Sequence, residues 1–326
     1  MMPRFARALA LWALVCAALG LVESGAVAAA RSEESATGAR PAAKPKCDLD
    51  GPLVYLQSSP SGNSSLQVFT QQGLTFTYCY EVSLPLGYAF PIRVDQAQNV
   101  WAVGSSVEEF VKGGMQLERT LTGAGSPLDI AVDTDGSVYL SQNNSTTIEV
   151  YAPGSNSPTS HLTAGCNGSG LALDAQHDLY VATSCGLTAI DLTTGERANI
   201  PTSLRLQWMQ TTATGALAGC TTGGTCGSLS SPGPGKTSTW RPIFRAGEIE
   251  GFVLFPGEQL ALVNLYNTGG GVFGWPGPDR GQEVTIGDGS TEVPWGVAVS
   301  PADPFGAPFY AFSTSHGRPG RRENRP

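Results

Sequence analysis

Short apolar runs alternate with polar turns along most of the chain, at a spacing typical of β-strands. The best-defined copies are FPIRVDQAQNVWAVG, SPLDIAVDTDGSVYLSQ and GSGLALDAQHDLYVATS, and each consists of an apolar run, an aspartate, a polar turn and a second apolar run. Short apolar runs bounded by Gly, Asp and Asn predict strands joined by tight turns. We therefore predict an all-β fold built from a repeated hairpin.

The repeat has a nearly constant spacing. The anchor positions of its six copies are Asp95, Asp133, Asp174, Gln210, Phe255 and Ser300, at spacings of 38, 41, 36, 45 and 45 residues. A period of about 40 residues is typical of the blades of a β-propeller. We predict that the strand before each anchor is the innermost of its blade, and that the anchor aspartates are structural turn residues.

The two ends of the repeat region complement each other. GVAVS and FYAFS near the C-terminus supply inner strands, whereas LVYLQ, LQVFT and TFTYCYEV near the N-terminus supply outer strands. Pairing these strands closes a ring and removes exposed sheet edges. Five internal blades and one composite blade give a six-bladed propeller, and seven blades result if residues 53–56 and 309–312 belong to different blades.

One run, SPLDIAVDTDGSVYLSQNNSTTIEVYAPG, resembles an NHL-type repeat, and similar tandem repeats occur in exported bacterial propeller proteins. The resemblance is specific over residues 88–195 and degenerate elsewhere. It implies a β-propeller fold and says little about function, because propellers host many unrelated activities.

The first 28 residues have the three parts of a secretory signal peptide. Two arginines within residues 4–7 precede an apolar run over residues 8–22, and small residues at 26–28 form a cleavage site, with Ala30 as an alternative end. That run is shorter than the roughly 20 residues of a spanning helix, so we expect a secreted or periplasmic protein without a membrane span. The alternative is lipidation at Cys16, which is disfavoured because Val15 stands where a lipobox has a small residue.

These features divide the chain into four parts. We expect a signal peptide over residues 1–28, a flexible leader over 29–46, a single propeller domain over 47–316 and a disordered basic tail over 317–326.

Removal of the signal peptide leaves six cysteines, and an even number in an exported chain predicts disulfides. Many pairings are possible, but pairing neighbours in sequence places each bridge within one blade. The expected pairs are Cys47 with Cys79, Cys166 with Cys185, and Cys220 with Cys226. A zinc site is disfavoured because the sequence has no C-x-x-C and its three histidines are scattered.

Composition supports the fold and limits the partners. The 41 glycines, 23 prolines and only 14% charged residues favour short strands and tight turns. A net charge of −8 disfavours a nucleic-acid partner, since such proteins need clustered Lys and Arg.

The candidate binding residues are those that precede the innermost strands, because these are expected at the mouth of the channel. They are Phe90, Asp129, Arg205, Glu250 and Trp295. Aromatic walls with a few polar groups are typical of small-ligand sites. The alternative is blade packing for the two aromatic residues, and a solvated rim or an internal ion pair for Asp129 and Arg205.

Two propeller enzyme families are the rival interpretation. Gluconolactonase-like lactonases hold a divalent metal in the channel with Glu, Asn and Asp side chains, and streptogramin lyases use a channel His, acidic residues and magnesium. Among the residues that precede the inner strands, only Asp129 and Glu250 could bind a metal, with Asn167 and Asn264 as candidate additional ligands. Arg205 opposes a cation, and no histidine falls at a channel position.

We therefore expect a monomeric, non-catalytic propeller without metal or cofactor that binds a protein or small-molecule ligand. A metal-dependent lactonase or lyase is the alternative, and a structural envelope or matrix component is a third hypothesis.

Overall fold

The chain divides into two compact units, residues 1–44 and 45–326. The computed structural model describes, within the second unit, residues 47–58, 64–72, 75–84, 91–114, 116–200, 202, 204–212, 215–221, 223–230, 239–245, 249–254, 260–265, 269–274 and 294–300. The side chains of residues 244, 250, 260–265, 269–274 and 294–295 lie outside this description. The predicted signal peptide, leader and tail likewise lie outside it.

The regular elements of the described residues are all strands, arranged in six antiparallel sheets. Blade 1 has the strand order β23 (Pro294–Ser300), β1 (Leu53–Ser58), β2 (Ser64–Gln72) and β3 (Thr75–Leu84). Blade 2 has β4 (Ile92–Val94), β5 (Val100–Val103), β6 (Val107–Phe110) and β7 (Leu117–Leu121). Blade 3 has β8 (Pro127–Val132), β9 (Val138–Gln142), β10 (Thr147–Tyr151) and β11 (Ser160–Thr163). Blade 4 has β12 (Gly168–Leu173), β13 (Asp178–Thr183), β14 (Gly186–Asp191) and β15 (Arg197–Ile200). Blade 5 has β16 (Leu206–Thr211), β17 (Leu217–Thr221), β18 (Thr225–Ser230) and β19 (Thr239–Arg245). The three-stranded sheet has β20 (Ile249–Leu254), β21 (Leu260–Leu265) and β22 (Gly269–Gly274).

The fold is an all-β propeller with five complete four-stranded blades, and its sixth sheet has three strands among the described residues. The prediction of six blades, with seven as the alternative, is therefore corrected to five. The reason lies in the repeat itself, because an anchor marks an innermost strand and carries no information on whether a fourth strand follows.

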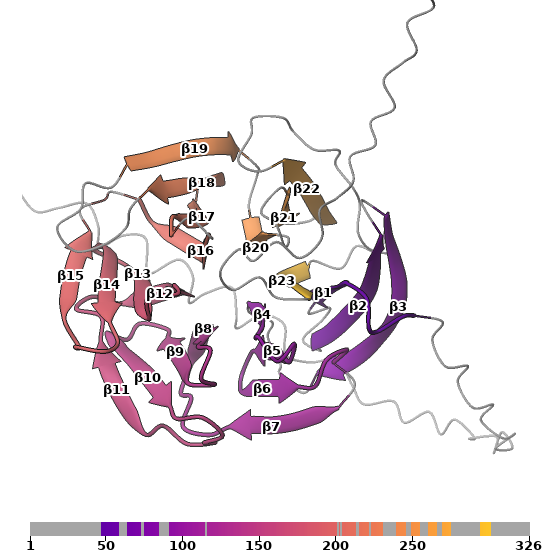
Figure 1. Cartoon of the computed structure of the whole chain (residues 1–326), viewed down its shortest axis with the longest axis horizontal. Helices are drawn as coiled ribbons and strands as arrows, with labels where there is room; N and C mark the ends of the chain where they lie inside the picture. The colour runs from indigo at the N-terminus through magenta and orange to yellow at the C-terminus, as the bar shows by residue number, and fades with distance from the viewer. Residues whose placement is uncertain are drawn as a thin grey trace, which may run out of the picture. The chain divides into compact units, whose positions relative to one another are not determined.

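The sheets surround a common centre, with β4, β8, β12, β16, β20 and β23 innermost (Figure 1). Each of these strands contacts the innermost strand of the next sheet, and β20 contacts β23. No helix long and apolar enough to cross a membrane occurs in the part of the chain that the structure describes.

Blade 1 joins segments from both ends of the described chain. Strand β23 pairs with β1 in antiparallel register, with Leu53 opposite Ser300 and Val54 opposite Val299. The predicted composite blade is thus confirmed for GVAVS, whereas FYAFS lies outside the described residues.

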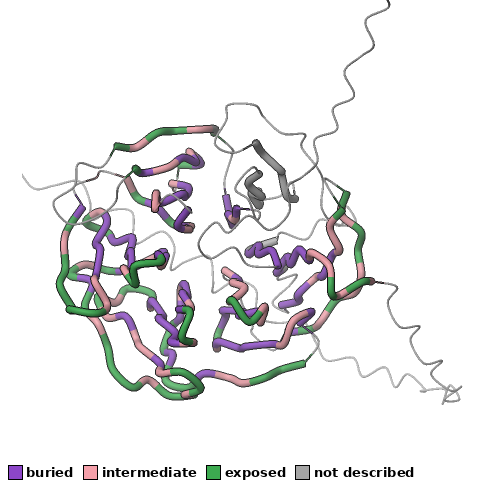
Figure 2. Tube along the Cα trace, in the orientation of Figure 1, coloured by how far each residue is buried: buried purple, intermediate pink, exposed green. Residues whose placement is uncertain are grey.

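The core is divided among the seams between neighbouring sheets. In β1, Leu53 and Tyr55 pack in a cluster with blade 2, whereas Val54 and Leu56 pack in a cluster that includes Val253 of the three-stranded sheet. Because successive strand residues point to opposite faces, a strand covered on both faces needs a continuous apolar run. Figure 2 accordingly shows buried residues on the inner strands and exposed residues on the outermost strands.

The repeated turn joins each innermost strand to the second strand. In blade 2 the N–H of Asp95 donates to the carbonyl of Asn99, and the N–H of Gln98 donates to the carbonyl of Asp95, both at 3.0 Å. The same two bonds begin at Asp133, Asp174 and Thr212. The fourth turn position has a positive φ in every case: 70° at Gln98, 86° at Gly136, 63° at His177 and 73° at Gly215. The blade 5 anchor is therefore Thr212, two residues beyond the predicted Gln210.

The three predicted disulfides are present. Cys47 is bonded to Cys79 on the outermost strand β3, and Cys166 to Cys185 across the open end of the β12–β13 hairpin. Cys220 and Cys226 are direct cross-strand neighbours on β17 and β18. Each bridge therefore ties elements of one blade, as predicted.

Candidate functional site

The central channel is narrow and mainly apolar. It encloses a cavity of about 110 Å³ lined by three residues from each innermost strand. Most of these residues are aliphatic, and the polar exceptions are Arg93, Gln210 and Thr211. This volume is below the roughly 300–1,000 Å³ that is typical of small-ligand pockets. A ligand of ordinary size that uses the channel would therefore have to bind at one of its mouths.

Asp129 links three successive blades beside this channel. Its carboxylate accepts a bond from the guanidinium of Arg93 on β4 at 2.9 Å and from the backbone N–H of Leu171 on β12 at 2.8 Å. The other carboxylate oxygen accepts the N–H of Ile130 at 2.8 Å. Burial raises the pKa of Asp129, while the Arg93 cation and the two N–H donors oppose that rise.

Other channel side chains also bond to the neighbouring innermost strand. Gln210 accepts the N–H of Leu254 at 3.0 Å, and the hydroxyl of Thr211 donates to the carbonyl of Leu173. An innermost strand has one free edge, and unpaired backbone groups there are costly when buried. Gln210 and Thr211, like Asp129, thus satisfy backbone groups of a neighbouring innermost strand, which is a structural role.

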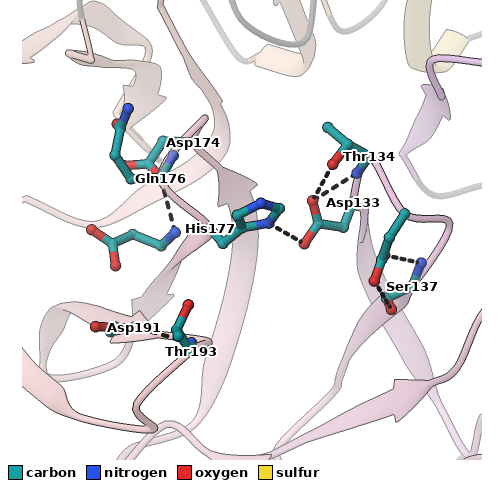
Figure 3. A network of polar contacts seen from close by, with 10 residues as sticks. Asp133, Thr134, Ser137, Asp174, Gln176, His177, Asp191 and Thr193 are labelled. Carbon is teal, nitrogen blue, oxygen red and sulfur yellow. Dashed lines mark hydrogen bonds and ion pairs between the residues drawn. The ribbon is translucent and has the colours of Figure 1, made fainter.

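A second polar cluster joins the turns of blades 3 and 4 (Figure 3). The imidazole Nδ1 of His177 lies 2.9 Å from a carboxylate oxygen of Asp133, whose other oxygen accepts the N–H of Thr134 at 2.6 Å. The carboxylate is buried, whereas 47% of the imidazole is exposed. The hydrogen bond to Asp133, and then the charge of Asp133, raise the pKa of His177.

Asp133 differs from the other anchors in its partner. Asp95 accepts the indole N–H of Trp101 at 2.9 Å, and Asp174 accepts the hydroxyl of Tyr180 at 2.9 Å. In both blades the donor follows the anchor by six residues. The oxygen of Asp133 instead contacts His177 of the next blade, so this pair connects two blades at their turns.

The predicted site residues fall into different environments. Arg205 is exposed just before β16, whereas Asp129 is buried within β8. Glu250 and Trp295 are each the second residue of an innermost strand, and their side chains lie outside the description. Phe90 also lies outside the described residues. No hydrogen bond or ion pair of the described residues joins Arg205 to Asp129, which pairs with Arg93 instead.

Two residues of these clusters were missed by sequence reasoning. Arg93 precedes its anchor by two residues on an apolar strand, and nothing in the sequence indicated its partner. His177 carried a signal, because aligning the repeats places it where Gly136 stands in the preceding copy. A histidine at a turn position that favours glycine is informative.

The described residues offer little for metal chemistry. Over the described ranges, no three His, Cys, Asp or Glu side chains converge as a metal site would require. His177 with Asp133 could act as an oriented general base, but no nucleophile is bonded to it in this part of the structure.

Comparison with known proteins gives no assignment, since no model of a protein family and no curated protein matches the chain.

Proposed function

We propose that the chain is an exported, extracytoplasmic propeller with NHL-like repeats that acts without catalysis, as a scaffold for a protein or small-molecule ligand. The observation that carries this proposal is the pairing of Asp129, Gln210 and Thr211 with backbone groups of neighbouring inner strands. These side chains already bond within the protein, and the channel cavity of about 110 Å³ is smaller than the roughly 300–1,000 Å³ of most small-ligand pockets.

Binding is proposed at the channel mouth where the innermost strands begin. Arg205 is exposed there, Glu250 and Trp295 are the second residues of β20 and β23, and Phe90 precedes β4 by two residues in the sequence. Asp129 contributes from within by holding Arg93. Aromatic, acidic and basic side chains around one channel mouth suit a ligand that has both an apolar part and a charged part.

Export is supported by the three disulfides, because such bonds persist outside the reducing cytoplasm. The N-terminal sequence gives the expected route. Mass spectrometry of the secreted protein should show cleavage after Ala28, with all six remaining cysteines oxidised. A retained N-terminus, or free thiols in the mature protein, would contradict this part of the proposal.

Metal analysis tests the absence of catalysis most directly. The wild type and the Glu250→Ala variant are compared, with Glu118→Ala as a matched control because Glu118 is exposed on the outermost strand β7. We expect no stoichiometric calcium, magnesium or zinc in any of the three proteins, and no hydrolysis of a lactone panel. Metal that is lost only in Glu250→Ala, together with lactone hydrolysis, would replace the scaffold by a metal-dependent lactonase.

A further inference from the structure

The seam between blades 1 and 2 contains two buried oxygen atoms without a hydrogen-bond partner. They are Oε1 of Gln57 and Oε2 of Glu108. Gln57 is 0% exposed and Glu108 is 4% exposed. Among the residues that the structure describes, these are the only such side-chain atoms. A buried polar atom without a partner calls for a specific explanation.

The strand register places both side chains in the same seam. Glu108 on β6 lies opposite Ala102, which packs in the apolar cluster shared with Leu53 and Tyr55 of blade 1. Directly opposed residues share a face, so Glu108 faces blade 1. Gln57 follows Tyr55 by two residues on β1 and therefore faces blade 2.

A hydrogen bond across the seam fixes the amide of Gln57. Its Nε2 donates to the carbonyl of Val103 on β5 at 3.2 Å. Val103 is paired with Val107, the neighbour of Glu108. Because Nε2 is committed to a carbonyl, the amide cannot turn over without placing two oxygens together. Oε1 of Gln57 is thus an acceptor that needs a donor.

No cation of the described residues neutralises Glu108. The next residue, Glu109, takes part in a separate ion pair with Arg119, and Lys112 donates to the carbonyl of Asp50. Two other titratable groups of this seam are Tyr55 and Tyr80, which both bond to Gly113. Burial raises the pKa of each phenol, so both are neutral near pH 7.

We propose that Glu108 is a neutral carboxylic acid in the folded protein, and that its proton is the donor which serves the unpaired Gln57 oxygen across the seam. A buried carboxyl without a counter-ion avoids a large desolvation cost by taking up a proton. The direction of its pKa agrees, since burial raises the pKa of Glu108. One proton accounts for both unpaired oxygens.

Protonation of Glu108 affects the closure of the ring, because Glu108 lies in the seam between blades 1 and 2. Blade 1 is the composite blade in which β1 pairs with β23, so its seam with blade 2 belongs to the closure of the ring. Ionisation of Glu108 would place a charge in that seam opposite an amide oxygen. Ring closure is therefore tightest under mildly acidic conditions and loosens as the pH rises.

The sign of the pH dependence follows from linkage. An unfolded glutamate has a pKa of about 4.3. Below that pH the carboxyl is protonated in both states, and its contribution to stability is fully present. Between about 4.3 and the raised pKa of the folded state, only the unfolded chain ionises, so the contribution falls and is lost once the pH passes the folded pKa.

The test compares the wild type with Glu108→Gln, which is always neutral, has nearly the same shape and carries its own N–H donors. Glu118→Gln is the matched control, since Glu118 is exposed on β7. Thermal unfolding is followed from pH 4 to pH 8. We expect Glu108→Gln to unfold a few degrees above the wild type at pH 8, the difference to shrink toward pH 4, and Glu118→Gln to follow the wild type throughout.

Infrared difference spectra provide a readout that does not depend on stability. At pH 7 the wild type should show a protonated carboxyl band that is missing in Glu108→Gln. Gln57→Met, which removes the acceptor, should keep the band and shift its frequency. If Glu108→Gln fails to fold, Gln57→Met still tests the proposal, because a band that belongs to Glu108 must shift when its acceptor is removed.

Three results would overturn the proposal. The first is an ionised Glu108 in the wild type at pH 7. The second is a difference in unfolding temperature between wild type and Glu108→Gln that does not change with pH. The third is a rise in unfolding temperature on adding calcium or sodium in the wild type but not in Glu108→Gln, which would place a metal cation in the seam instead of a proton.

Discussion

The carboxylate of Asp129 in blade 3 accepts the backbone N–H of Leu171 in blade 4 at 2.8 Å. The same oxygen accepts the guanidinium of Arg93 in blade 2 at 2.9 Å. One side chain thus connects the innermost strands of three blades. Asp129 satisfies a strand edge that would otherwise face an apolar channel, and this explains why a charged residue stands within an apolar strand.

Removal of the Asp129 carboxylate should destabilise the ring. Asp129→Ala leaves Arg93 and the N–H of Leu171 unpaired, and breaking a buried ion pair costs about 3–5 kcal/mol. Asp129→Asn keeps an acceptor for Leu171 and should cost less, about 2 kcal/mol. Urea unfolding measures both changes in the free energy of unfolding. Asp50→Asn, at an exposed position, should change it by less than about 0.5 kcal/mol.

Equal losses for Asp129→Ala and Asp129→Asn would show that the bond to Leu171 contributes nothing. No loss in either variant would contradict the structural role and return Asp129 to the set of candidate binding residues.

The propeller could be predicted from the sequence because its repeat is local. The spacing of Asp95, Asp133 and Asp174 reports the hairpin at the centre of each blade, and each expected disulfide ties elements of one blade. The blade count was overestimated because only innermost strands leave a recognisable anchor.

The polar pairs between blades could not be predicted. The contacts of Asp129 with Arg93 and of His177 with Asp133 join residues 36 and 44 positions apart, across seams whose register depends on how two sheets pack. A sequence register accurate to one or two residues leaves such partners undetermined, as the misplaced anchor at Gln210 shows. The candidate mouth residues remain predictions for the same reason.

Gly170 of blade 4 lies in close contact with the backbone of blade 5. A Cβ at this position would lie 2.1 Å from the carbonyl oxygen of Gln207 on β16, and backbone cannot move aside as a flexible side chain can. Gly170→Ala should therefore destabilise the protein by about 1–3 kcal/mol, the usual range for overpacking.

Gly51→Ala is the matched control, because its Cβ would lie at an ordinary 3.6 Å from the nearest atom. Chemical unfolding of both variants measures the difference. Equal stability of the two variants would show that the backbones of blades 4 and 5 are not in close contact at Gly170.

Loss of a disulfide should cost stability in the order of loop length. The bridges join cysteines 32, 19 and 6 residues apart for Cys47–Cys79, Cys166–Cys185 and Cys220–Cys226. In the chain-entropy model, removal of the first two costs about 3–4 kcal/mol each and removal of the third about 2 kcal/mol. Three double Cys→Ser variants, each lacking one bridge, check this order by urea unfolding.

The Cys220–Cys226 variant needs a separate control, because both side chains are fully buried and serine would place a hydroxyl there. A Cys→Ala pair removes that complication. A larger loss for the alanine pair than for either longer bridge would indicate that packing at this site, and not chain entropy, sets the contribution.

The pair of His177 and Asp133 should make the junction of blades 3 and 4 sensitive to pH. Asp133 raises the pKa of His177, so the contribution of the pair is fully present below about pH 6.5, where His is protonated in both states. It is lost as the pH rises through the folded pKa. Because the imidazole is 47% exposed, solvent screening should keep the effect below about 1 kcal/mol.

NMR titration of the His177 ring should show a higher pKa in the wild type than in Asp133→Asn, while the signals of His161 on β11 report whether the variant is folded. Identical titration of His177 in both proteins would mean that the two blades are not joined at this point in solution.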